Sequence, residues 1–211
     1  MRLVRSAALL VALLASLFLS ACGGSLGDRE REDFLEIRTS LLEREKLSLR
    51  ADLRADYGDR VYDYRLSYVG NAEEGVLRIE EPLELEDVRV ELTEGHARLR
   101  YGDLMLDTGA LAGEESPVQA FPLMIRAWLR GSVAECWHER MEEEDCTAAE
   151  IHLGGAGAET SLVCRAWFRR SDWEPVFAEL AAEGRVCLTC RFLPRIEETP
   201  EVYCFPLCGR M

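Results

Sequence analysis

The sequence predicts an α+β domain built on an antiparallel sheet. Residues 47–56 alternate apolar and polar side chains, which is the period of a half-buried strand. Short runs of the same kind follow at regular spacing, separated by turn residues such as Gly102-Asp103. Two segments show helical spacing instead, one before the strands and one between two groups of strands. Together these observations favour one sheet covered by two helices.

The first 21 residues are predicted to be a signal peptide and not part of the domain. Arg2 and Arg5 give a cationic start, and the apolar run that follows is too short to span a bilayer core of ~30 Å stably. The run ends in Leu-Ser-Ala-Cys22, which resembles the lipobox of bacterial lipoproteins. This resemblance implies cleavage before Cys22 and a diacylglyceryl group on its sulfur, with acyl chains such as palmitate. The alternative is an ordinary signal peptide with a chance cysteine.

The mature chain then divides into a lipidated tether (22–27), one domain (28–193) and an irregular tail (194–211). The domain begins with an amphipathic helix over 28–46, in which Phe34, Ile37 and Leu41 recur at helical spacing. Strands are expected at 47–56, 60–69, 76–80, 88–92, 97–101 and 104–107, and again at 132–139, 149–153, 161–168, 175–180 and 185–192. An acidic loop is expected over 140–145.

A second helix is expected over 116–131, between the two groups of strands. Ser116 and Pro117 suit the N-cap and first helical position, since both relieve backbone N–H groups that have no partner there. Gly131 ends the segment. Its apolar stripe has few charged interruptions, so this helix should be deeply buried or cover a cavity.

With these elements placed, the chain resembles the LolA/LolB-like lipoprotein-carrier superfamily, in particular exported lipoproteins of Firmicutes such as a clostridial germination lipoprotein. The segments that carry the resemblance are residues 52–68, 99–109, 116–131 and 178–192. The resemblance implies a strongly curved antiparallel sheet, a LolA-like open half-barrel, with helices packed in the concave face over an apolar cavity. It supplies no catalytic motif.

Aromatic and aliphatic side chains on one strand and on the second helix are candidates for lining this cavity. A ligand and the protein's own core could each fill such a space, and both readings stay open. The candidate lining residues are Tyr62, Tyr64, Leu66, Tyr68, Phe121, Ile125, Trp128 and Leu129.

The functional hypothesis is a membrane-anchored, extracytoplasmic, lipid-binding lipoprotein of the cell envelope, with a lipid-like ligand or a hydrophobic protein segment in the cavity. The alternative is a non-catalytic regulatory or scaffolding lipoprotein that acts on an envelope or cell-wall partner, and the resemblance suggests sporulation or germination as its process. The formal charge is −14, and removing Arg2 and Arg5 leaves −16 on the mature chain. Such a chain repels nucleic acid and anionic lipid surfaces, so the anchor must hold it at the membrane.

No enzyme, cofactor or metal site is predicted. HExxH and phosphate-loop motifs are absent, and the single GxSxG match, at 23–27, lies in the predicted tether and not after a strand. Cys136 and His138, two apart on a strand, would stand nearly 7 Å apart. Seven cysteines remain after Cys22, an odd number that precludes complete intramolecular pairing. Cys187, Cys190, Cys204 and Cys208 could hold zinc, form a disulfide or stay unlinked. Zinc is disfavoured because a separation of three points Cys187 and Cys190 to opposite faces of a strand.

Overall fold

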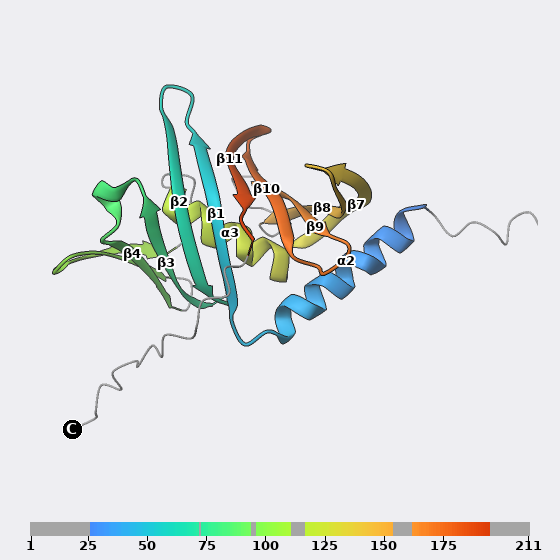
Figure 1. Ribbon diagram of the computed structural model, residues 1–211, viewed down its shortest axis with the longest axis horizontal. Helices are drawn as coiled ribbons and strands as arrows, with labels where there is room; N and C mark the ends of the chain where they lie inside the picture. Colours follow the sequence, from blue (N-terminus) through green and yellow to red (C-terminus); the bar gives the residue numbers. More distant parts are fainter. Residues whose placement is uncertain (1–25, 72, 94–95, 111–116, 154–161, 195–211) are drawn as a thin grey trace, which may run out of the picture.

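The computed structural model describes residues 26–71, 73–93, 96–110, 117–153 and 162–194. Within these ranges the chain forms one antiparallel sheet of eleven strands, two α-helices and a 3-10 turn. The sheet is open, with β6 and β7 at its two edges (Figure 1). The helices are α2 (Leu26–Glu43) and α3 (Pro117–Arg130), and the turn is η2 (Leu83–Leu85). The strands are β1 (Leu47–Asp56), β2 (Val61–Gly70), β3 (Glu74–Glu81), β4 (Val88–Thr93), β5 (His96–Tyr101), β6 (Leu104–Ala110), β7 (Ser132–Met141), β8 (Glu144–Leu153), β9 (Leu162–Arg169), β10 (Pro175–Ala182) and β11 (Arg185–Phe192).

Each expected strand and helix is present, but one predicted loop is wrong. The acidic segment 140–145 is not a loop, because β7 continues to Met141 and β8 starts at Glu144. Glu142 and Glu143 both have positive φ angles, 50° and 71°, and form the whole connection. A two-residue turn of this hand matches the twist of paired strands, so the ladder continues almost to its end.

The sheet consists of two meanders that meet at β1 and β11. β1 to β6 follow each other from the centre to one edge, and β7 to β11 run from the other edge back to the centre. Ala51 of β1 pairs with Phe192 of β11, and Ala55 pairs with Leu188. β1 and β11, the first and last strands in the sequence, are therefore neighbours at the centre of the sheet, and their pairing joins the two meanders.

Both helices lie on the same face of the sheet, which we call the inner face. Phe34 of α2 and Trp128 of α3 both contact the ring of Phe168 on β9, with ring centroids 6.0 and 5.2 Å apart. Trp128 also contacts Phe192 of β11 at 5.3 Å. The opposite face, which carries Asp52 and other charged side chains between the inward ones, is the outer face. That the inner face is the concave one remains a prediction.

The chain order explains why α3 lies across the sheet. α3 follows β6 at one edge and precedes β7 at the other, so the connection must cross the sheet. In Figure 1 α3 runs along the sheet between these edges. With 14 residues it is about 21 Å long. Its apolar side chains are thereby brought against the inner-face residues of several strands.

One arginine ties the two helices together. The Arg38 guanidinium on α2 donates to the backbone carbonyl oxygens of Trp128 and Gly131, at 2.7 and 3.0 Å. The last carbonyl groups of a helix have no partner within it, so Arg38 completes the C-terminal end of α3. Arg38 also lies over the Phe34 ring, 5.1 Å from its centroid.

The predicted signal peptide and lipidation site lie outside the described residues, and so does the predicted tail (194–211) except for its first residue. These parts of the domain division remain predictions. Of the helices that the structure describes, none is long and apolar enough to cross a membrane.

Replacing Trp128 by alanine should destabilise the fold strongly. The side chain is fully buried, and its removal leaves a large cavity between α3 and the sheet. Substitutions of this kind cost about 3–5 kcal/mol of unfolding free energy. The matched control is Leu42→Ala on α2, where the side chain is 55% exposed and the cost should stay within about 0.5 kcal/mol. Urea unfolding followed by far-ultraviolet circular dichroism measures both, and equal midpoints for the two variants would contradict this packing.

Candidate functional site

Six of the eight predicted cavity-lining residues lie together in a closed aromatic and aliphatic layer. The Phe121 ring lies 5.9 Å from Tyr68 of β2 and 6.2 Å from Phe192 of β11. Trp128 continues the layer to Phe168. At these separations aromatic rings are in contact. The six residues are 4% exposed or less: Leu66, Tyr68, Phe121, Ile125, Trp128 and Leu129.

The other two predicted residues lie apart from α3. Tyr62 and Tyr64 stack on one another with centroids 6.3 Å apart, and Tyr62 also meets Tyr57 of the β1–β2 hairpin. Tyr62 is 37% exposed, and Tyr64 is half-buried. The tyrosine stripe therefore continues along β2 beyond the part that α3 covers.

Tyr68 is held by structural contacts. Its hydroxyl donates to the carbonyl oxygen of Asn71 at 2.6 Å, and burial raises its pKa to about 12. The ring lies directly on Gly75, where a Cβ atom would come within 2.4 Å of the Tyr68 oxygen. Gly75 is thus required for the ring to pack.

Trp128 is held by its surroundings without a conventional hydrogen bond. Its indole N–H is buried and has no oxygen or nitrogen acceptor. The indole N–H instead lies beside the sulfur of Cys164. Burial raises the pKa of the Cys164 thiol to about 12, although the contact with the indole N–H acts in the opposite direction and lowers it. Sequence reasoning did not single out Phe168 or Phe192 as partners of Trp128, although each occupied an inward position of a predicted strand.

The structure has a pocket on the opposite side, on the outer face. Its volume is about 300 Å³, and it lies over β10, β11, β1, β2 and β3. Outer-face side chains of opposite charge alternate around it. The lining residues are Asp52, Leu53, Arg54, Asp63, Tyr64, Arg65, Glu81, Phe177, Thr189 and Arg191.

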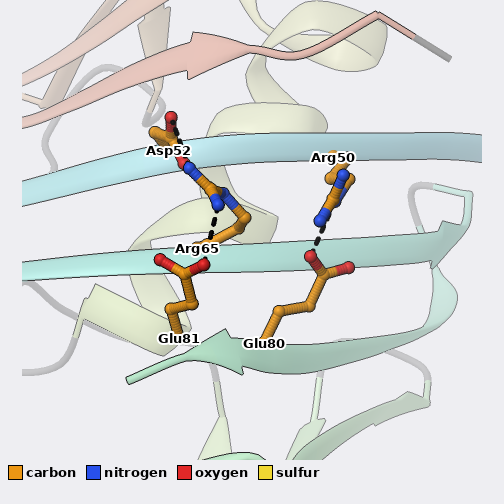
Figure 2. A network of polar contacts seen from close by, with 5 residues as sticks. All are labelled: Arg50, Asp52, Arg65, Glu80 and Glu81. Atoms are coloured by element: carbon orange, nitrogen blue, oxygen red, sulfur yellow. Dashed lines mark hydrogen bonds and ion pairs between the residues drawn. The ribbon is translucent and has the colours of Figure 1, made fainter. Parts of the chain in front are cut away.

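Arg65 is the centre of the charged network. Figure 2 shows its guanidinium between the carboxylates of Asp52 and Glu81, each 2.7 Å away. The hydrogen bond that Arg65 donates to the Asp52 carboxylate, and the negative charge of that carboxylate, raise the pKa of Arg65. Arg50 makes a similar pair with Glu80 at 2.6 Å. These contacts join β1, β2 and β3 across the outer face.

The register places the pocket on one continuous row of cross-strand neighbours. This row begins with apolar residues, three of them aromatic, over β7 to β10 and becomes alternately charged from β11 to β3. Its members, in order across the sheet, are Trp137, Ala148, Trp167, Phe177, Arg191, Asp52, Arg65 and Glu81. Within the row Phe177 marks the change from apolar to charged.

Sequence reasoning did not single out these charged residues and missed the pocket. A partial indication was present, because a hairpin with its turn at Tyr57-Gly58 places Asp52 opposite Arg65 and Arg54 opposite Asp63. The contributions of Phe177, Thr189 and Arg191 depend on the pairing of β11 with β1. That pairing has no local sequence signal.

The apolar half of the row, over β7 to β10, is packed. Trp137 and Trp167 meet edge to face at 6.2 Å, and Trp167 lies 5.6 Å from Phe177. The carboxylate of Glu139 accepts hydrogen bonds from the indole N–H groups of both tryptophans. This cluster forms a small second core on the outer face.

His138, which the sequence places two residues from Cys136, contacts acidic side chains of α2. His138 Nε2 lies 2.9 Å from an Asp33 carboxylate oxygen, and its Nδ1 lies 3.8 Å from Glu30, both on α2. Burial raises the pKa of the Cys136 thiol to about 11. His152 of the neighbouring strand β8 lies 3.3 Å from Glu150. His138 therefore helps attach α2 to β7.

The prediction that Cys187 and Cys190 point to opposite faces of their strand is wrong. Where β10 pairs with β11, Leu180 lies opposite Leu188, but the next residue, Ala181, lies opposite Val186. This bulge includes Cys187, so the regular alternation of inward and outward side chains along β11 is interrupted there. Cys187 and Cys190 both belong to the main core, and the Cys187 thiol donates to the Leu180 carbonyl oxygen at 3.2 Å. Among described residues no group of three or more histidine, cysteine or acidic side chains could hold a metal ion. Cys204 and Cys208 lie outside the described residues, so the four-cysteine alternatives remain predictions.

Comparisons with known proteins give matches of fold only. No protein-family model and no curated protein matches the chain. The solved structures that resemble it include a LolA-superfamily protein of Nitrosomonas europaea, with 12% identity over 80% of this chain and 94% of that one, at a TM-score of 0.45. They also include the lipoprotein LppX of Mycobacterium tuberculosis (10% identity, 78% and 92% covered, TM-score 0.40). A complex of the CwlD amidase with the GerS lipoprotein of Clostridioides difficile also matches, with 12% identity over 76% of this chain and 91% of that one, at a TM-score of 0.40. These are proteins of the kind that the sequence analysis named, and at such scores they support no argument about function.

Alkylation should find the buried cysteines unreactive in the folded protein. Burial raises the pKa of Cys136 and Cys164 to about 11 and 12 and that of Cys146 and Cys190 upward as well, so little thiolate exists near pH 8. Iodoacetamide labelling at pH 8, mapped by peptide mass spectrometry, should leave these four unmodified, with reactivity rising only as the pH approaches 11. In denaturant without reductant all four should label. Labelling of any of them in the folded protein at the unfolded rate would contradict their burial.

Proposed function

We propose that the protein is a lipid-anchored, extracytoplasmic, non-catalytic scaffold that binds an envelope protein through the outer face of its sheet. The observation that carries this proposal is the complete burial of the aromatic face of α3. Phe121 and Trp128 are 0% exposed and contact the sheet ring to ring. The helix thus occupies the space that a carrier would give to its ligand, and the outer face is left to meet a partner.

The anchor in this proposal is Cys22, four residues before the first residue of α2. Two acyl chains on this cysteine would hold the protein firmly at a membrane. The mature charge of −16 would keep the body of the protein away from anionic lipid headgroups. The outer face would then remain available for binding.

A second candidate is the binding of a lipid-like ligand or hydrophobic segment between α3 and the sheet. It is favoured by the continuity of the apolar layer, in which each ring contacts the next. The order of the rings is Phe34, Phe168, Trp128, Phe192, Phe121 and Tyr68. Such a ligand would require α3 to move away from the sheet. Trp128 would then contact the ligand directly.

Native mass spectrometry of the lipidated protein, purified from membranes in detergent, distinguishes the two candidates. If the protein is a scaffold, the measured mass should equal that of the polypeptide with its own lipid anchor, with no additional bound molecule. An additional lipid in stoichiometric amount, lost in a folded Trp128→Phe variant, would overturn the scaffold in favour of a carrier.

Site-specific photo-crosslinking in the source cell tests the binding face. A photoreactive residue at Arg54 should give an adduct with one discrete protein, because this side chain is 59% exposed beside the outer pocket. The matched position is Leu42, which is similarly exposed on α2. An adduct of the same size from both positions, or none from Arg54, would contradict binding through the outer face.

A further inference from the structure

We infer that the outer pocket is a binding site for a small zwitterion, a free amino acid or dipeptide that presents both an ammonium and a carboxylate group. This goes beyond the scaffold function and does not depend on it, because it concerns a small molecule and not the protein partner. The site was not expected from the sequence. Three features of the pocket support the inference: its positive and negative charges balance, its ion pairs differ in strength, and one side of it is an apolar wall.

The charges that line the pocket balance. Three carboxylates and three guanidinium groups face it: Asp52, Asp63 and Glu81, and Arg54, Arg65 and Arg191. A ligand of one sign would place its charge beside like charges of the wall. A zwitterion can direct each end to a group of opposite sign, so it is the charge type that a neutral, mixed lining favours.

The ion pairs around the pocket differ in length and exposure, and Arg191 is itself paired with Glu142 of the β7–β8 turn at 2.5 Å, through one of its guanidinium N–H groups. Arg65 is held by Asp52 and Glu81 at 2.7 Å, and its side chain is 32% exposed. Arg54 and Asp63 are 3.2 Å apart and 59% and 69% exposed. Exposed pairs of this kind contribute little to stability. A ligand can therefore exchange with the Arg54–Asp63 pair and leave the Arg65 network intact.

The positions of the arginines suit a carboxylate. Arg54 is the cross-strand partner of Thr189, and Arg191 is two residues beyond Thr189 on the same strand. Thr189 is short and leaves room between the two longer side chains. A carboxylate there could accept from the guanidinium groups and from the Thr189 hydroxyl, and guanidinium–carboxylate pairing is among the stronger hydrogen bonds in proteins. Asp63, released from Arg54, would receive the ammonium group.

Phe177 supplies the apolar wall, and the volume limits the size of the ligand. The ring is half-buried at the boundary with the Trp167 cluster, so it is fixed in place while still facing the pocket. A volume of about 300 Å³ is at the lower end for small-molecule sites. The pocket thus suits a dipeptide with one apolar side chain.

Isothermal titration calorimetry of the mature lipidated protein in detergent, with L-alanyl-L-phenylalanine as the probe, tests the inference. Saturable binding at millimolar dipeptide or below is expected. The N-acetylated and the C-amidated forms should each bind at least about tenfold more weakly, because each loses one charged contact. Absence of saturable binding, or equal binding of the capped forms, would overturn the zwitterion site.

A matched pair of arginine variants locates the site. Arg54→Gln should weaken dipeptide binding by about tenfold or more, since it removes a guanidinium from the pocket. Arg60→Gln should bind as the unchanged protein does, because Arg60 is 72% exposed, pairs with Asp59 in the hairpin turn and is not part of the lining. Both positions are exposed, so thermal unfolding should confirm that both variants fold. Unchanged affinity in Arg54→Gln would show that the dipeptide binds elsewhere and would overturn the assignment.

Discussion

The passage of α3 from one edge of the sheet to the other is the constraint on which the rest of the structure depends. β6 and β7 are opposite edges of one sheet, yet α3 connects them directly in the sequence. The helix must therefore lie over the strands between, and its apolar residues have to be buried there. Trp128, between Phe168 and Phe192, is the main contact. Arg38 then joins α2 to the end of α3, so both helices are fixed on the inner face.

This arrangement gives the two faces of the sheet different properties. The inner face is apolar and covered, with side chains such as Leu53, Leu66 and Leu77 at 2% exposure or less. Both described helices lie on the inner face, and the outer face carries ion pairs and a small aromatic cluster. A pocket forms there where the row of cross-strand neighbours passes from Phe177 to Arg191. The chemistry available to a partner or ligand is therefore that of charged groups beside one aromatic ring.

Most of the elements could be predicted because their signals are local. Alternation along residues 47–56 and turn residues between the runs fix strands, while Ser116-Pro117 and Gly131 delimit a helix. The turn at Glu142 and Glu143 was missed since neither residue commonly adopts positive φ. The bulge at Cys187 was missed for a similar reason, because it depends on the match between β10 and β11. The candidate site was harder still: its lining comes from five strands, and the β1–β11 pairing that joins them is not local.

Hydrogen exchange resolved by mass spectrometry is the most direct test of the central claim that α3 is an integral part of the core. If α3 fills the inner face permanently, the amides of residues 117–130 should exchange as slowly as those of β1 and β11, and with the same dependence on denaturant, because only global unfolding exposes them. Exchange of α3 well before these strands would contradict the account. The helix would then be able to leave the sheet, and the apolar layer beneath it could open to a ligand.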